Sequence, residues 1–109
     1  MTPETIKSAV ADYFNLPVLA IDSKSRKKEL VKARHMAMNC FLLLTDFSLS
    51  HIGKEFGKHH CAVIHARKSV NNQAYYNRGY RSELRDVLCK LGFYNMEYSK
   101  YEQYETDKT

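Results

Sequence analysis

The sequence predicts a small all-α domain, because apolar residues recur at helical spacing and Gly and Pro stand at the ends of the periodic segments. Its 109 residues are close to the commonest size of one compact domain, so we expect a single core. We assign residues 1–93 to this helical domain and residues 94–109 to a Tyr-rich polar tail. The longest uncharged apolar run, 36–44, is too short to cross a bilayer, so no membrane partner is expected.

The first helix is expected over residues 3–14. Thr2 can accept hydrogen bonds from early backbone amides, and Pro3 suits a first turn in which its missing N–H would have no partner. Apolar side chains then recur three or four residues apart, at Ile6, Ala9, Val10, Tyr13 and Phe14. We expect one short helical turn over 18–21 to follow, and then a polar loop over 22–27.

The longest helix is expected over 28–44, which lacks Gly and Pro and is rich in good helix formers. Ser48 is placed to cap a short helix over 49–56, and Gly57 suits the left-handed position that ends it. The next helix, over 60–75, is expected to bury Val63, Ile64, the stem of Arg67 and Val70. A short helix, a turn containing Gly and a longer helix form a helix-turn-helix, here over about 49–75.

The last helix is expected after an interruption at residues 77–79. Apolar periodicity resumes at Leu84, Val87, Leu88 and Leu91 and ends at Gly92. In the tail, tyrosines that would line one helical face stand at Tyr94, Tyr98, Tyr101 and Tyr104. For this tyrosine row we favour packing over a partner surface.

The net charge of +5 is concentrated in one segment. Residues 24–34 hold six cations against Glu29 alone, so this segment carries +5 and the rest of the chain sums to zero. The cations are Lys24, Arg26, Lys27, Lys28, Lys32 and Arg34. Such an excess is typical of a surface that meets phosphates, but a solvated basic helix face gives the same pattern.

The helix-turn-helix and the basic segment together favour binding to duplex DNA. The first turns of the second helix in such a motif face base edges in the major groove. Here those turns hold Lys58, His59, His60, Cys61, Ala62 and His65. Arg26 on the loop suits a narrow minor groove, where negative potential is focused, and Lys32 and Arg34 are placed to hold the backbone. An ordinary helical bundle has helices at the same spacing, so the pattern alone leaves other functions open.

Three ordered segments resemble the C-terminal DNA-binding domain, domain IV, of the bacterial replication initiator DnaA. They read KARHMAM over 32–38, SLSHIGKEFG over 48–57 and HCAVIHA over 60–66. The resemblance covers about residues 6–72. It implies a helical domain of the Trp-repressor-like class that binds short duplex sites, with a recognition helix in the major groove and a basic-loop arginine in the minor groove.

By this resemblance, Arg26 matches the basic-loop arginine, Arg34 an arginine that touches DNA, and His60 the motif histidine. Residues 48–50 match the start of the first helix of the pair, whose backbone amides can meet a phosphate. The expected DNA-binding residues are Lys24, Arg26, Lys27, Lys28, Lys32, Arg34, His35, Ser48, Leu49, Ser50, Lys58, His59, His60, Cys61, Ala62, His65 and Lys68.

Several positions depart from the family pattern. His35 stands where the family has glutamine, Lys58 takes the place of a turn arginine, and the turn is one residue shorter. His59 replaces an aspartate, and Cys61 and Ala62 replace two threonines that read bases. The cations expected to meet phosphates are still present, so we expect general affinity for duplex DNA with an altered sequence preference. Each lost contact between a side chain and a base costs about 1–3 kcal/mol in discrimination.

Catalytic, metal and cofactor functions are not expected. Cys61 and His65 lie one helical turn apart, but no zinc-finger spacing supplies further ligands. No acid is placed to orient His60 and Cys61 as base and nucleophile. The segment 53–59 has only three residues between its glycines and no Ser or Thr after its lysine, so it is not a nucleotide-binding phosphate loop.

Three widely spaced cysteines and an N-terminus without a secretory signal favour a reducing cytoplasm. The expected role is a stand-alone regulator of replication initiation, through origin binding, or of transcription, without ATPase and with other replication or regulatory proteins as further partners. The competing function is a small helical adaptor whose basic surface binds an acidic protein, and structured RNA is a further alternative. The target sequence and the oligomeric state are not predicted.

Overall fold

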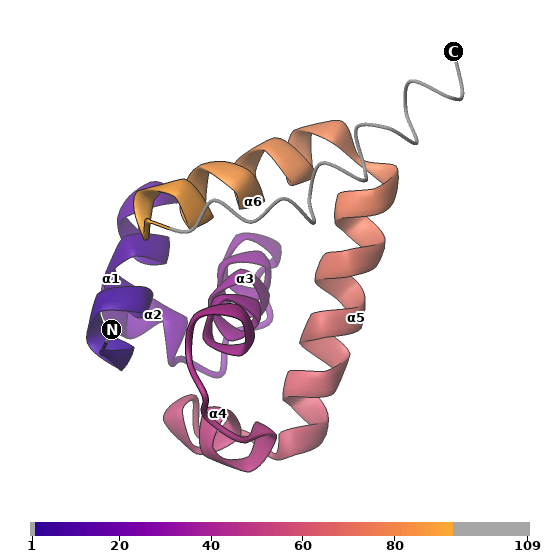
Figure 1. Ribbon diagram of the computed structural model, residues 1–109. Coiled ribbons are helices and arrows are strands. Elements are labelled where there is room, and N and C mark those ends of the chain that lie inside the picture. The colour runs from indigo at the N-terminus through magenta and orange to yellow at the C-terminus, as the bar shows by residue number, and fades with distance from the viewer. Residues whose placement is uncertain (1, 93–109) are drawn as a thin grey trace.

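The computed structural model describes residues 2–92, and the described part consists of six α-helices without a strand (Figure 1). The helices are α1 (Pro3–Tyr13), α2 (Val18–Ile21), α3 (Lys28–Leu44), α4 (Leu49–Glu55), α5 (His60–Tyr76) and α6 (Arg78–Lys90). The all-α class is confirmed, and the first five helices agree with the expected bounds to within one residue. The expected tyrosine row of the tail lies outside the described residues.

Helix α3 is the central element of the fold. Figure 1 shows it nearly end-on, with α1 and α2 on one side and α5 on the other, and it packs against α1, α2, α4 and α5. Its fully buried side chains include Ala33, Met36, Ala37, Cys40 and Phe41. Cys40 is a fully buried core residue, and this burial raises the pKa of its thiol to about 12. Only the start of α3, with Lys28 and Glu29, is exposed.

Helices α4 and α5 pack against each other and against α3. The face of α5 that lies in the core consists of Val63, Ala66, Val70 and Ala74, spaced by three or four residues. Arg67 as a whole is exposed, and the expected burial of its stem alone stays a prediction. At about 100° per residue, Arg67 lies about 40° from Val63 and about 60° from Val70, at the edge of the buried stripe.

The break expected at residues 77–79 is narrower than the sequence indicates. Asn77 ends α5 and begins α6, and its side-chain Oδ1 accepts a hydrogen bond from the backbone N–H of Tyr80 at 3.0 Å. Gly79 consequently lies inside the first turn of α6. An asparagine cap satisfies the free amides of a new helix, so one residue suffices to redirect the chain. The expected end of α6 is confirmed by Gly92, whose φ is +83°.

Helix α6 closes the bundle over α1. The Tyr13 hydroxyl on α1 donates a hydrogen bond to the Asp86 carboxylate on α6 at 2.9 Å. Burial, followed by this carboxylate, raises the pKa of Tyr13 to about 12. No helix among residues 2–92 combines the length and the apolar character that crossing a membrane requires.

Candidate nucleic-acid interface

Arg34 on α3 stabilises the basic loop, residues 22–27, by hydrogen bonds to backbone carbonyls. Arg34 is only 6% exposed, and its Nε donates to the Ile21 carbonyl at 3.0 Å. Its two Nη atoms donate to the carbonyls of Ser23 and Ser25. Burial lowers the pKa of Arg34, and the nearby Asp22 carboxylate opposes that shift. The expected contact of Arg34 with DNA is therefore replaced in this structure by a supporting role, because its donors are directed at the loop backbone.

A second buried cation, Lys7, joins the loop to the helix-turn-helix. The Lys7 ammonium lies 2.9 Å from the Asp22 carboxylate and donates to the Glu55 carbonyl at the end of α4 at 2.6 Å. It also lies 4.8 Å from the centre of the Phe56 ring. Sequence reasoning missed Lys7. The available signal was a lysine next to Ile6 in the apolar stripe of the first helix.

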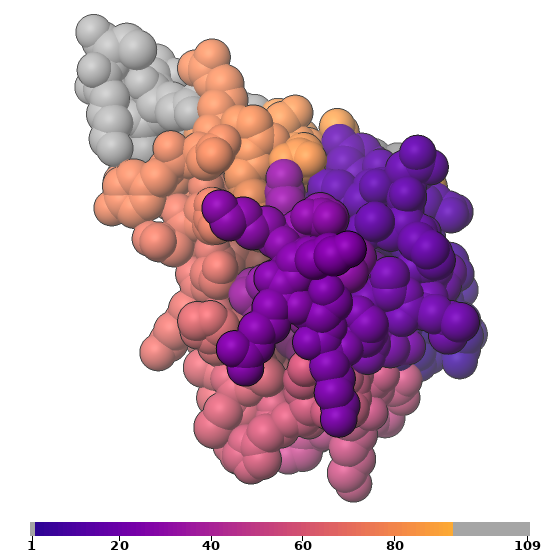
Figure 2. Space-filling model, turned by 180° about the vertical axis from the view of Figure 1, so that it is seen from behind, coloured from indigo at the N-terminus to yellow at the C-terminus, as the bar shows by residue number. Residues whose placement is uncertain are grey.

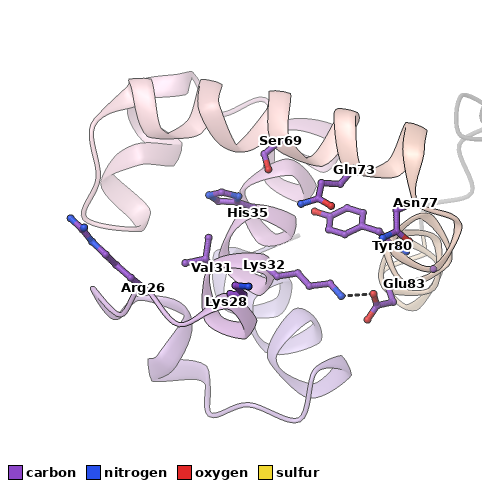
Figure 3. Close-up of a pocket in the computed structure, with 11 residues that line it drawn as sticks. Arg26, Lys28, Val31, Lys32, His35, Ser69, Gln73, Asn77, Tyr80 and Glu83 are labelled. Atoms are coloured by element: carbon purple, nitrogen blue, oxygen red, sulfur yellow. Dashed lines mark hydrogen bonds and ion pairs between the residues drawn. The ribbon is translucent and has the colours of Figure 1, made fainter.

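The loop itself presents its cations to solvent. Lys24, Arg26 and Lys27 are exposed, as is Lys28 at the start of α3, and Figure 3 shows the Arg26 side chain pointing away from the fold. Seen from the back in Figure 2, side chains of this purple segment project from the surface beside α5. Four of the six cations counted in the sequence are therefore available to a ligand.

Lys32 has a different environment from its neighbours. Its ammonium forms an ion pair with Glu83 on α6 (Figure 3). The ammonium also lies 5.5 Å from the ring centres of Phe14 and Tyr80. A cation compensated in this way offers a phosphate less attraction than an exposed one. Lys32 thus lies beside the expected interface, but its ion pair with Glu83 joins α3 to α6.

The helix-turn-helix depends on a close approach at Gly53. A Cβ added there would lie 2.6 Å from the Lys58 carbonyl oxygen, and the Lys58 N–H donates to the Gly53 carbonyl at 2.8 Å. Gly57 adopts a φ of +64°, which confirms the expected left-handed position after α4. Ser48 caps α4 by accepting from the His51 N–H at 3.1 Å. Two glycines therefore allow the turn to pass tightly beneath α4.

The start of α5 is open to solvent. Of the expected base-facing residues, His59, Cys61 and His65 are exposed, and Lys58, His60 and Ala62 are partly exposed; Lys68, expected to meet DNA further along α5, is exposed. His59 caps α5, since its Nδ1 accepts from the Cys61 N–H at 3.3 Å. Ser48 and Ser50 at the start of α4 are exposed, and Leu49 is partly buried.

His35 connects the two halves of this surface. Its ring meets the His65 ring edge-on, with centres 5.6 Å apart, so α3 and α5 touch through this pair. Burial lowers the pKa of His35, and the neighbouring His65 and Arg34 lower it further. His35 is therefore neutral at pH 7 and can both donate and accept a hydrogen bond.

A groove with a volume of about 610 Å³ runs along the same face (Figure 3). Arg26 and Lys28 line one end, His35 and Ser69 lie along its walls, and Tyr80 is at the far end. The groove therefore joins two of the exposed cations to the middle of α5 and to α6, where Glu83 also lines it.

Three potential metal ligands lie together at the start of α5. The potential ligand atoms of His59, His60 and Cys61 lie within 4.8 Å of one another. From the sequence, these three residues together with His65 are potential metal ligands, and no metal site is expected. Among residues 2–92, no other group of three or more His, Cys, Asp or Glu side chains is placed to hold a metal ion.

Comparison with known proteins identifies the family of the chain. The family described as bacterial dnaA protein helix-turn-helix matches residues 3–70. The chromosomal replication initiator protein DnaA of Bacteroides fragilis is 43% identical over 92 residues, which is 84% of this chain and 19% of that protein. The proteins of the same name from Flavobacterium psychrophilum and Caldanaerobacter subterraneus are 36% identical over 87 residues and 31% over 94 residues. These matches cover 79% and 86% of this chain, and 18% and 21% of the respective relatives.

The chain spans about a fifth of the length of the curated relatives it matches. Their similarity covers the helix-turn-helix, the basic loop and the supporting residues described above. A helix-turn-helix is a DNA-binding arrangement, so this homology supports DNA binding. The chain belongs to the bacterial DnaA helix-turn-helix family.

Proposed function

We propose that the chain binds double-stranded DNA, with the first turns of α5 in the major groove and Arg26 in an adjacent minor groove. The observation that carries this proposal is the common face formed by the exposed cations of the loop and the open start of α5. A recognition helix needs an unobstructed first turn, and His59, Cys61 and His65 meet that requirement.

The cations divide between two tasks. Lys24, Lys27 and Lys28 neutralise phosphates and supply affinity that does not depend on sequence. Arg26, at the end of a polar loop, enters the narrow groove, where negative potential is focused. Arg34 and Lys7 act as positioning residues, because their donors hold the loop and α4 in place.

Sequence preference is assigned to the start of α5. His60 can donate to or accept from a base edge, and the small Ala62 lets the helix approach closely. Cys61 lacks the hydroxyl and methyl groups of threonine, so the preferred site differs from that of relatives with threonine there.

The proposed biological role is to occupy duplex sites, without nucleotide hydrolysis or other catalysis. Occupying a site can mark it for other replication or regulatory proteins, or deny it to a resident initiator. Both outcomes make the chain a regulator of replication initiation or of transcription. Selection of bound fragments from a random duplex pool would identify the preferred sequence.

The direct test is to measure binding to a random-sequence duplex by fluorescence anisotropy over a range of salt concentrations. Arg26→Ala should lower affinity and reduce the slope of log K against log salt by about one unit, because one phosphate-like contact is lost. Lys90→Ala is the matched control, since Lys90 is an exposed cation at the end of α6.

Equal effects of the two substitutions would refute the minor-groove role of Arg26. Absence of binding by the unmodified chain even at low salt would refute DNA binding altogether. That result would favour the alternative of an adaptor whose basic surface binds an acidic protein.

A further inference from the structure

We propose that His59, His60 and Cys61 form a binding site for a tetrahedral transition-metal ion, Zn²⁺ foremost, at the start of α5. All three side chains come from consecutive residues, and their ligand atoms lie within 4.8 Å of one another. The His59 and His60 ring centres are 4.2 Å apart, so the two imidazoles already lie on the same side of the helix start.

The donor spacing suits zinc. The Nε2 atom of His60 lies 3.8 Å from the Sγ atom of Cys61. In a tetrahedral site with Zn–N and Zn–S bonds of ordinary length, the corresponding ligand separation is about 3.6 Å. Small side-chain rotations would bring the third donor to a similar separation, because His59 and Cys61 are exposed and His60 is only partly buried.

The chemistry of the donors is also appropriate. Two imidazoles and one thiolate suit a borderline or soft cation, whereas Mg²⁺ and Ca²⁺ prefer oxygen ligands. On binding, the Cys61 thiol transfers its proton to water as the Zn–S bond forms, and no oxidation state changes. Three protein ligands leave the fourth position for water.

Metal binding competes with the cap of α5. In the capped state, Nδ1 of His59 accepts from the Cys61 N–H, so a neutral imidazole carries its proton on Nε2. Ligation through Nδ1 uses the same lone pair, and ligation through Nε2 moves the proton onto Nδ1. Either route removes this hydrogen bond, so the metal alters the first turn of α5 as well as covering it.

This coupling rests on the proposed function, in which the same three residues face the major groove. A bound metal occupies the side chains that would meet base edges and places an ion and its water in front of them. Zn²⁺ is therefore expected to weaken DNA binding, which would make the chain a metal-responsive DNA-binding protein.

The site itself is tested without DNA, by titrating Co²⁺ into the untagged full chain with its thiols kept reduced. One Co²⁺ per chain should bind with tetrahedral visible bands and a thiolate-to-cobalt charge-transfer band, and Zn²⁺ should displace it. Cys61→Ser should abolish the charge-transfer band, while the control Cys89→Ser should retain it. His60→Ala should weaken Co²⁺ binding by at least about tenfold, while the control His51→Ala should not.

Absence of the charge-transfer band, its survival in Cys61→Ser, or a stoichiometry of one metal per two chains would overturn the proposed site. Circular dichroism establishes that each variant remains helical. The link to DNA is tested with a random duplex, which Zn²⁺ should release from the unmodified chain but not from Cys61→Ser. Unchanged or tighter binding in Zn²⁺ would overturn the antagonism. A chain that binds Co²⁺ but no duplex would refute the proposed function and leave the metal site standing.

Discussion

The basic loop and the start of α5 reach the same face of the molecule with very different support. The loop has no regular structure, yet buried Arg34 and Lys7 hold its backbone and its Asp22 side chain. The start of α5 is a regular helix whose exposed side chains contact mainly one another and, through His65, the His35 ring. The charged loop is thus positioned by buried side chains, whereas the residues proposed to face bases are exposed side chains.

This difference separates two kinds of substitution. A change in the buried support should alter stability and affinity together, because the loop loses its anchor. A change at the start of α5 should alter the choice of sequence and leave stability and random-duplex affinity almost unchanged. Substitutions in the two regions therefore test whether they are independent.

The largest effect is expected for Arg34→Met. Removing the guanidinium leaves the carbonyls of Ile21 and Ser23 without this donor, so the free energy of unfolding should fall by about 3 kcal/mol, as for buried charged hydrogen bonds. Affinity for a random duplex should fall as well. Urea unfolding and anisotropy measure the two quantities, with Arg26→Ala as the exposed control that leaves stability unchanged. Loss of affinity at unchanged stability would show that Arg34 contacts DNA directly.

A somewhat smaller loss is expected for Gly53→Ala. The added methyl would meet the Lys58 carbonyl oxygen at 2.6 Å, so α4 and the turn must move apart at a cost of about 2 kcal/mol. Gly79→Ala is the matched control, because its Cβ would meet only the Asn77 side-chain oxygen, at 3.3 Å. Thermal unfolding compares the two variants. Equal stability of both would contradict the close approach at Gly53.

Cys61→Thr should act on specificity alone. A threonine adds a hydroxyl and a methyl group at an exposed position, so preference among duplex sequences should change by about 1 kcal/mol. Competition between selected and random duplexes measures this preference, and urea unfolding should give the value of the unmodified chain. A uniform change on every sequence would count against base contacts by this residue.

The smallest effect is expected for His35→Gln. The pKa of His35 is lowered below 6.5 in the fold, so the unfolded chain binds its proton more readily. The contribution of His35 to stability is therefore complete above about pH 6.5 and is lost as the pH falls further. The glutamine variant should lose less stability on acidification, as measured by urea unfolding at several pH values. An identical pH dependence in both proteins would exclude His35 as its source.

Much of the fold could be predicted because its signals are local. Ser48, Gly57 and Gly92 act within one turn of their own helix ends, and their capping or left-handed geometry is as expected. The misjudged position, Gly79, concerns how far the Asn77 cap reaches. Such details depend on the neighbouring helix and not on the local pattern alone.

The candidate site was predictable in position but not in the use of each cation. Six cations in one segment look equivalent in the sequence. In the fold, Lys32 pairs with a carboxylate 51 residues away, and Arg34 donates to the loop backbone. Lys7 was missed for the same reason, since its partner Glu55 is 48 residues distant.

The sequence by itself determined the helices, the helix-turn-helix and the location of the positive charge, because periodicity, caps and composition act through neighbours along the chain. Only the tertiary structure decided that Arg34 and Lys7 are internal supports and that Lys32 pairs with Glu83. Electrostatic and coordinating interactions depend on distances of a few ångströms between side chains, and the packing of the helices sets those distances.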